Sequence, residues 1–286
     1  MLQDSLAEHE PGLAPVPVTA PFLRWAGGKR WLVPQLLRLA RQHDFRNYHE
    51  PFVGGGSVFF ALAPKGTAYL SDLNGDLIEV YQQVRDSPEE VASAIAQYQN
   101  TAESYYSARA QVPIEPSARA ARFIFLNHTS YNGIYRVNLR GEYNVPFGAR
   151  PSPKIPGLPA LQTASRVLAG AVLRSKDFGD ALDDVDAGDL VFLDPPYTVA
   201  HNNNGFIKYN QHLFSFEDQE RLAGRIAEIS KRGAYFALTN AAHSSIDTLF
   251  SSLGRKIVVT RRNSVGGKSA SRGRTEEFLF TNLGEL

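Results

Sequence analysis

The sequence predicts an α/β fold: a parallel sheet with a separate subdomain inserted into it. Short apolar strands alternate with helices in the first and last thirds of the chain, which is the pattern of βαβ units. A glycine turn at 54–56 joins one strand to the following apolar segment. Between residues 86 and 174 the alternation stops. We therefore expect one domain formed by 20–85 and 175–286, interrupted by a subdomain of 86–174.

The composition is that of a folded protein without cysteine chemistry. Hydrophobic residues make up 43% of the 286 residues, enough to bury a full core. The 30 Lys and Arg nearly balance 29 Asp and Glu, which excludes a histone-like protein but not a local basic face. The absence of Cys excludes disulfides, zinc fingers, iron–sulfur sites and a cysteine nucleophile. Without a long apolar run or a basic signal region, the expected location is cytoplasmic.

The first third of the chain contains the elements that open an α/β domain. Residues 1–19 hold three prolines and no amphipathic period, which indicates a flexible tail. A Leu-rich helix is expected at Trp31–Arg41, followed by a strand at Asn47–Glu50 and the glycine turn at 54–56. An apolar segment at Ser57–Leu62, a second strand at Ala68–Ser71 and a further helix at Leu77–Val84 come next.

The inserted stretch begins with helical segments and then loses its helical period. Val91–Gln97 and Ala118–Leu126 are typical of helices. Residues 130–160 are rich in Gly, Asn, Tyr and Pro. Two short strands around Arg140-Gly141-Glu142 would form a β-hairpin there.

The last third returns to the alternation of strands and helices. Its expected elements are strand Asp189–Leu193, helix Phe216–Lys231, strand Ala234–Leu238, helix His243–Leu253, and strands Lys256–Arg261 and Glu277–Thr281. The two final strands flank a glycine-rich basic loop. Such a loop suits contacts to phosphates, although a solvated charged loop is the alternative.

A glycine turn followed by an acidic strand end indicates a nucleoside site. Glycines allow a ligand to approach the backbone closely. Asp72 ends the next strand, where a carboxylate can accept hydrogen bonds from a ribose. The pattern does not separate a dinucleotide from S-adenosylmethionine, and a turn that serves packing alone is the simpler alternative.

The most specific signal is Asp194-Pro195-Pro196-Tyr197 at the end of an apolar strand. The prolines stiffen the turn and remove two donors, leaving the Asp194 carboxylate and the Pro195 carbonyl as acceptors. Two rigid acceptors suit a planar amino group that becomes a nucleophile, and Tyr197 offers a stacking face. The alternative is an ordinary strand-to-loop turn.

Three weaker patterns complete the candidate site. Gly27-Gly28-Lys29 begins a helix whose free N–H groups could meet an anion. Asn127–Gly148 interleaves Asn, Arg and Tyr, and Arg and Asn side chains can each bond a base edge in two places. The alternative for the first pattern is an ordinary glycine-rich start of a helix. The alternative for the second is a polar hairpin that binds nothing. The histidines lack ligand spacing, so we expect no metal.

Taken together, these segments resemble the Dam-like (D12 class, alpha group) DNA adenine-N6 methyltransferases. The resemblance extends over roughly residues 21–282 and follows the order of motifs in that family. The matching segments are Leu23–Lys29, Glu50–Ser57, Ser71–Asn74, Tyr131–Arg136, Asn138–Gly148 and Asp194–Tyr197. Arg24 stands where relatives commonly have Lys, which keeps the charge but changes the hydrogen-bond geometry.

The resemblance implies a Rossmann-like S-adenosylmethionine-dependent methyltransferase fold with an inserted, mostly helical DNA-recognition subdomain that carries a β-hairpin. It implies that Asp194, Pro195, Pro196 and Tyr197 are catalytic. The implied cofactor-binding residues are Trp25, Lys29, Glu50, Phe52, Gly54, Gly56, Asp72, Asp177, Phe178 and Asp194. The implied DNA-binding residues are Arg24, Asn132, Ile134, Arg136, Asn138, Arg140, Asn144 and Pro146, with Arg261, Lys268, Arg272 and Arg274 from the basic loop.

The expected reaction is methylation of adenine N6 in duplex DNA after base flipping. GATC is the expected recognition sequence, with Arg136 reading a base and Ile134 contacting a thymine methyl. The expected state is a monomer, with a cognate restriction endonuclease as a separate partner. Cytosine-N4 methylation remains the first alternative. A nicotinamide-dependent oxidoreductase would leave Asp194–Tyr197 unexplained, and a DNA-binding module without activity would leave the catalytic tetrad without a use.

Overall fold

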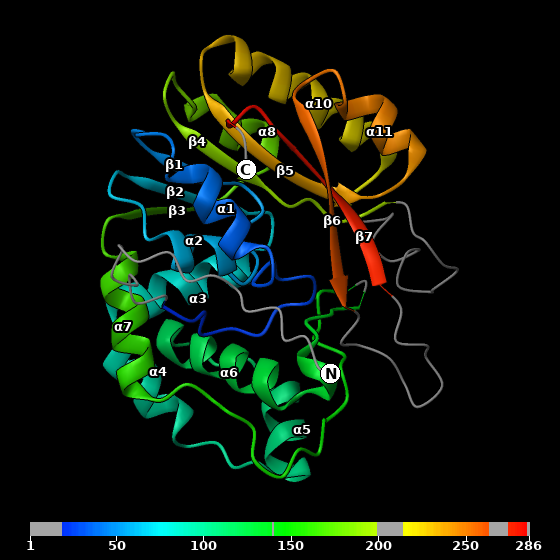
Figure 1. The fold of residues 1–286 in the computed structure, drawn as a ribbon. Helices are drawn as coiled ribbons and strands as arrows, with labels where there is room; N and C mark the ends of the chain where they lie inside the picture. The colour runs from blue at the N-terminus through cyan, green and yellow to red at the C-terminus, as the bar shows by residue number, and fades with distance from the viewer. Residues whose placement is uncertain (1–18, 139, 199–213, 263–273, 285–286) are drawn as a thin grey trace, which may run out of the picture.

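The computed structural model describes residues 19–138, 140–198, 214–262 and 274–284. Within these residues one seven-stranded sheet has the order β3-β2-β1-β4-β5-β7-β6 (Figure 1). Its strands are β1 Tyr48–Glu50, β2 Ala68–Asp72, β3 Ala171–Ser175, β4 Leu190–Leu193, β5 Tyr235–Ala241, β6 Arg255–Arg262 and β7 Arg274–Thr281. The α/β prediction is therefore confirmed.

The sheet is mixed, whereas the sequence predicted a parallel one. Strands β1 to β5 pair in parallel, but β7 runs antiparallel both to β5 and to β6. Strands β6 and β7 follow each other in the chain order, and their antiparallel pairing needs no long crossover connection. This hairpin adds β7 to the β5 edge, and this places residue 277 beside Ala241.

Helices cover both faces of the sheet because the central strands are apolar on both sides. Leu190 and Phe192 of β4 join the core beneath α1 Val33–Ala40, α2 Ser57–Leu62 and α3 Gly75–Asp86. Val191 and Leu193 point the other way. They pack with α8 Phe178–Ala181, η2 Leu182–Asp184, α10 Phe216–Lys231 and α11 Ser244–Phe250.

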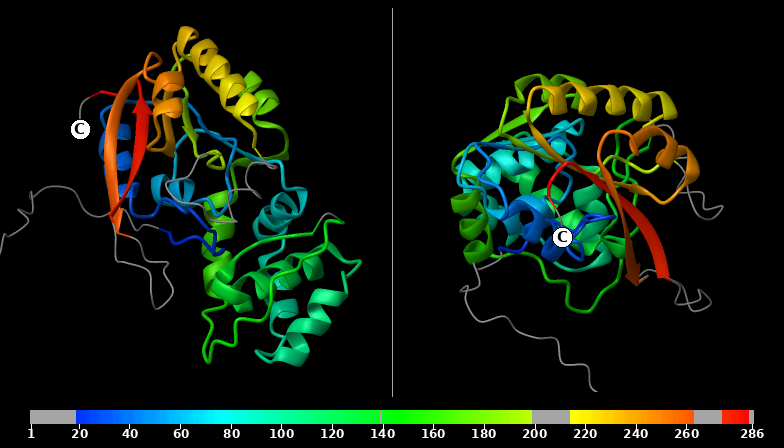
Figure 2. Two further views of the ribbon diagram at one scale, coloured as in Figure 1. Left: turned by 90° about the vertical axis from the view of Figure 1, so that its right-hand side faces the viewer. Right: turned by 45° about the horizontal axis from the view of Figure 1, so that its top comes forward.

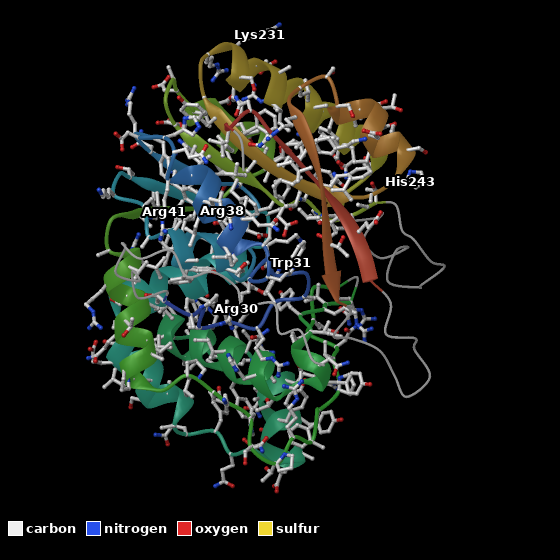
Figure 3. All side chains as sticks on the ribbon, viewed as in Figure 1. Arg30, Trp31, Arg38, Arg41, Lys231 and His243 are labelled. Carbon is white, nitrogen blue, oxygen red and sulfur yellow. The ribbon has the colours of Figure 1, made fainter. Side chains whose placement is uncertain are left out.

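The first helix illustrates how a short sequence pattern positions a layer. In α1 the apolar side chains Val33, Leu36 and Leu39 are buried against the sheet. Arg38 and Arg41 are exposed on its outer side (Figure 3). This spacing is the amphipathic pattern that predicted the helix.

The inserted residues form a helical layer at the end of the molecule opposite α10 and α11 (Figures 1 and 2). Its elements are α4 Pro88–Ile95, α5 Ala102–Ala110, α6 Pro116–Thr129, η1 Tyr131–Gly133 and α7 Leu158–Leu168. Side chains of α6 and α7, among them Ile124 and Leu161, share the larger core with α3. A small separate core holds Tyr105 of α5 against Phe125 of α6.

In place of the two predicted strands of a hairpin, the described residues of this segment form isolated bridges. Antiparallel bridges join Val137 to Tyr143 and Ser130 to Phe147. Asn138 holds the turn, because its Oδ1 accepts from the backbone N–H groups of Arg140 and Glu142 at 2.9 and 3.0 Å. Across the described ranges, no helix is both long and apolar enough to pass through a lipid bilayer.

Candidate active site

Three of the predicted site segments meet at one edge of the sheet, together with the end of a fourth strand. Strands β1, β2, β4 and β5 are parallel, so their carboxyl ends lie on the same side. Glu50 ends β1, Asp72 ends β2, and Asp194 follows β4 directly. Thr239 and Asn240 lie near the end of β5. Side chains that are far apart in the sequence are thereby brought into one site.

The glycine turn is tied to the acidic end of β2. The Gly54 N–H donates to one oxygen of Asp72 at 3.1 Å, and the Asn74 N–H donates to the other at 3.0 Å. Burial raises the pKa of the Asp72 carboxyl against the effect of these hydrogen bonds. Gly54 and Gly56 both adopt left-handed φ angles, of 46° and 64°, which favour glycine.

Trp25 packs directly onto this turn. A Cβ on Gly54 would lie 2.7 Å from the indole Nε1, and a Cβ on Gly55 would lie 2.7 Å from the Trp25 Cβ. On the other side the indole stacks on Tyr135 of the inserted segment, with 5.6 Å between ring centroids. The glycines are therefore needed for the approach of Trp25, which links the turn to the insertion.

Glu50 is buried just below the glycine turn. Its exposed fraction is 2%, and it accepts a hydrogen bond of 2.7 Å from the Tyr48 hydroxyl. Burial raises the pKa of Glu50 from 4.5 to about 8. The folded protein therefore retains this proton at pH values where the unfolded chain has released it. The stability contributed by neutral Glu50 is complete below pH 4.5 and is lost as the pH rises towards 8.

Replacing Glu50 by Gln should flatten the pH dependence of stability. Above about pH 6.5, where histidines are mostly neutral, the free energy of unfolding should fall less steeply up to pH 8 in Glu50→Gln than in the wild type. Urea unfolding at several pH values measures this difference. Glu90→Gln, an exposed substitution on α4, is the control and should follow the wild type. Identical slopes for Glu50→Gln and the wild type would contradict a protonated Glu50.

Phe52, Asp177 and Phe178 form a second group beside the turn. The rings of Phe52 and Phe178 stack at 5.4 Å, and the Arg221 guanidinium lies 4.1 Å from the Phe178 centroid. Arg221 also donates to both oxygens of Asp177, at 2.6 and 3.0 Å. Asp177 further caps α8 by accepting from the Gly179 N–H at 2.8 Å. Sequence reasoning placed Asp177 and Phe178 together, and it missed Arg221.

The Asp-Pro-Pro-Tyr segment lies in a network of charged side chains. The Lys29 ammonium lies 2.8 Å from Asp194 Oδ1 and 2.9 Å from Asp194 Oδ2. Thr239 on β5 donates to Oδ1 at 2.7 Å. Among the described residues Oδ1 therefore has two donors and Oδ2 has one, so Oδ2 retains a lone pair for a further donor. This geometry orients the carboxylate and leaves one acceptor for a ligand.

Tyr197 belongs to the same network through its hydroxyl. The phenol donates to Oε2 of Glu277 on β7 at 2.7 Å, and Lys29 Nζ lies 5.0 Å from its ring centroid. Burial, followed by the neighbouring Asp194 and Glu277 carboxylates, raises the pKa of the Tyr197 phenol well above its usual range. The phenol remains neutral and can keep donating its hydrogen bond.

The predicted DNA-reading residues lie together around η1 and the turn that follows it. Asn132, Arg136 and Arg140 are exposed, as is Pro146. Arg136 Nε donates to Asn144 Oδ1 across the turn at 2.8 Å. Ile134 is half-buried, with its backbone oxygen accepting from the Tyr143 hydroxyl at 2.7 Å.

Arg24 joins this group from the N-terminal segment. The buried Asn127 side chain holds its backbone by accepting from the Arg24 N–H at 2.8 Å and donating to its carbonyl at 2.7 Å. The Arg24 guanidinium donates to the Asn132 carbonyl at 3.4 Å. Asn127 lay inside the predicted polar segment, but no sequence signal distinguished it from its neighbours.

The basic loop is only partly covered by the described residues. Arg261 lies in β6 and Arg274 in β7, where they occupy neighbouring register positions. Lys268 and Arg272 lie outside the described ranges, as do residues 1–18. In the part of the chain that the structure covers, no group of three His, Asp or Glu side chains could hold a metal ion.

Comparisons with known proteins decide the family. Residues 25–264 match the family of the D12 class N6 adenine-specific DNA methyltransferases. The chain belongs to this family. A type II methyltransferase of Lactococcus lactis subsp. cremoris is 34% identical over 275 residues, which are 92% of this chain and 95% of that protein. The DNA adenine methylase of Escherichia coli K12 is 32% identical over 266 residues, with 90% and 93% coverage.

A third relative, a type II methyltransferase of Methanocaldococcus jannaschii, is 35% identical over 264 residues, covering 85% of this chain and 91% of that protein. The enzyme is an adenine-specific DNA methyltransferase, as the sequence predicted. Family membership separates it from a nicotinamide-dependent oxidoreductase. It also implies S-adenosylmethionine as the methyl donor and DNA as the substrate.

Proposed function

We propose that this methyltransferase modifies N6 of an adenine that is flipped out of duplex DNA, with Asp194 as the acceptor that activates the amino group. The observation that carries the proposal is the fixed Asp194 carboxylate. Lys29 and Thr239 hold it from two segments of the chain, and Oδ2 retains a lone pair for a further donor. A preorganised acceptor at the end of a central strand suits a group that develops positive charge during the reaction.

The residues around the glycine turn fit S-adenosylmethionine. When bound, this cofactor supplies a methyl group on a sulfonium. The left-handed glycines allow a close backbone approach, and the half-buried Asp72 carboxylate stands at a strand end where a ribose diol would be held. The half-buried Phe52 offers an aromatic ring beside it and stacks on the buried Phe178. We propose that these residues bind the cofactor together with Trp25, Lys29, Glu50 and Asp177.

The side chains of the Asp-Pro-Pro-Tyr segment then divide the work of the transfer. Asp194 Oδ2 and the Pro195 carbonyl accept the two N6 hydrogens, which concentrates the nitrogen lone pair. The Tyr197 ring stacks on the flipped base, and Pro196 stiffens the turn between them. Alignment and fixed acceptors contribute the catalysis, without a covalent enzyme intermediate. A chain without Cys is compatible with this chemistry.

We further propose that residues 86–174 recognise the DNA sequence. Asn132 and Arg136 present donors and acceptors on an exposed surface, the half-buried Arg24 joins them from the N-terminal segment, and the Asn144 amide holds the Arg136 guanidinium in place. Arg can donate two hydrogen bonds to a guanine edge, and Ile134 can contact a thymine methyl. Asn138, Arg140 and Pro146 line the adjacent turn, and the basic loop supplies phosphate contacts. We propose GATC as the site and a monomer as the active state.

Removing Arg136 should relax recognition at one base pair. In Arg136→Ala the preference for the correct base at that position should fall by about 1–3 kcal/mol, since one bidentate base contact is lost. Methylation rates on duplexes with every single-base substitution of the site measure this change. Arg150→Ala, a substitution outside the turn, is the control. An unchanged preference profile for Arg136→Ala would show that this side chain reads no base.

The recognition proposal is tested with labelled methyl donor and synthetic duplexes. One duplex contains GATC and the others contain the same bases in permuted order. We expect label in the GATC duplex alone, at the adenine. Equal labelling of all duplexes, or labelling of another permutation, would contradict the proposed site while leaving the enzyme class intact.

A further inference from the structure

A buried carboxylate that the proposed mechanism does not use lies beside the active site. Glu277 is on β7, and 3% of its surface is exposed. Its Oε2 accepts from the Tyr197 hydroxyl at 2.7 Å and lies 3.8 Å from the Lys29 ammonium. Burying a carboxylate is costly unless it is paired and hydrogen-bonded. Both of these partners are predicted site residues.

The hairpin topology explains how β7 reaches the site. Because β7 is inserted antiparallel beside β5, Glu277 pairs in register with Ala241, just beyond Thr239. Glu276 and Phe278, its neighbours along the strand, point to the opposite face of the sheet. Glu276 is exposed, in contrast to Glu277. The sheet thus directs one carboxylate of this strand towards the Asp194 network.

The contacts show what Glu277 can do. The hydrogen bond from the Tyr197 hydroxyl to a buried acceptor anchors the far end of this side chain, and it thereby sets the direction in which the ring extends from the backbone. The same carboxylate provides Lys29 with a second anion besides Asp194. Lys29 therefore interacts with both carboxylates, and its position determines the orientation of Asp194.

We propose that Glu277 is a positioning residue for methyl transfer: it fixes the Tyr197 ring and the Lys29 ammonium, and through them the stacking face and the Asp194 acceptor. The inference rests on the proposed function, because it assigns Tyr197 and Asp194 their roles. It extends the active site to the β6–β7 hairpin. A misplacement of about 1 Å in a reacting group can slow a reaction by about 10²-fold.

Single-turnover methyl transfer with excess enzyme tests the role. In Glu277→Ala the transfer rate should fall by about 10²-fold. The dissociation constants for S-adenosylmethionine and for duplex DNA should stay within about threefold of the wild type, a difference of about 0.7 kcal/mol. Glu277→Gln, which keeps an oxygen acceptor for the phenol, should recover most of the rate. Glu276→Ala on the opposite face is the matched control and should transfer at the wild-type rate.

A double-mutant cycle separates positioning from a general structural role. Tyr197→Phe keeps the ring and removes the hydroxyl that donates to Glu277. If Glu277 acts through this hydroxyl, Glu277→Ala should slow Tyr197→Phe far less than it slows the wild type. If Glu277→Ala slowed methyl transfer by the same factor in Tyr197→Phe as in the wild type, coupling through Tyr197 would be contradicted. Should Glu277→Ala fail to show a folding transition, Tyr197→Phe decides alone: an unchanged transfer rate overturns the proposal, and a large loss at unchanged cofactor affinity supports it.

The outcomes distinguish this inference from the proposed function. A wild-type enzyme that labels adenine N6, together with Glu277→Ala at full rate, would overturn the role of Glu277 alone. Labelling of a different base by the wild type would overturn the proposed function and the inference with it.

Discussion

Asp194→Ala should reduce methyl transfer by about 10³-fold or more, because it removes the oriented acceptor on which activation of the amino group depends. Lys29 and Thr239 would remain in place but would have no carboxylate to orient. The glycine turn and Asp72 form a separate hydrogen-bonded unit. Affinity for S-adenosylmethionine should therefore largely survive, as measured by calorimetric titration of the variant.

Two further variants make the Asp194 result specific. Asp194→Asn keeps the size of the side chain but replaces one acceptor oxygen with an NH₂ group facing Lys29, so it should also be inactive. Asp44→Ala, an exposed substitution that precedes the amino end of β1, should transfer normally. Full activity of Asp194→Ala would remove the central step of the proposed mechanism.

Gly56→Ala should strongly destabilise the fold, although it adds a single methyl group. Gly56 has a φ of 64°, and its Cβ would lie 2.7 Å from the Tyr81 hydroxyl and 3.2 Å from Phe60. We expect a loss of about 2–5 kcal/mol, since the left-handed conformation costs roughly 1–2 and overpacking about 1–3 kcal/mol. The Tyr81 hydroxyl donates to the Gly54 carbonyl at 3.0 Å, so its displacement should also weaken cofactor binding.

Urea unfolding measures the stability loss, and a second glycine supplies the control. Gly224 lies on the exposed side of α10, where a Cβ would meet nothing within 4 Å. Gly224→Ala should leave stability unchanged or raise it by up to about 1 kcal/mol through helix propensity. Equal stability of Gly56→Ala and the wild type would show that the turn adapts to a side chain.

Local patterns were sufficient to predict most of the fold. Helix Phe216–Lys231 has the predicted bounds, and the apolar segment predicted at Ser57–Leu62 is a helix, because the apolar spacing and flanking residues are encoded within each segment. Helices α5 and α7 were not predicted. In α5 only Tyr105 and Ala108 are buried, so its sequence carries little amphipathic signal. The antiparallel position of β7 was also missed, since register across a sheet depends on strands distant in sequence.

The candidate site likewise contains residues that the sequence predicted and residues that it did not. Residues within compact motifs, such as Gly54, Asp72 and Asp194, were predicted from their spacing and resemblance. Thr239 and Glu277 were not, because they reach Asp194 and Tyr197 only through the pairing of β5 with β4 and β7. The only available signal was a polar residue within an apolar strand. That signal does not reveal which side chain will lie beside the polar residue in the folded protein.

Methyl transfer to adenine is tested most directly by identifying the methylated nucleoside. The enzyme is incubated with methyl-labelled S-adenosylmethionine and unmethylated mixed-sequence DNA, and the DNA is then digested to nucleosides. We predict that the label is found in N6-methyladenine and is absent when Asp194→Ala replaces the wild type. Label in N4-methylcytosine, or unlabelled DNA despite bound cofactor, would contradict methyl transfer to adenine by this site.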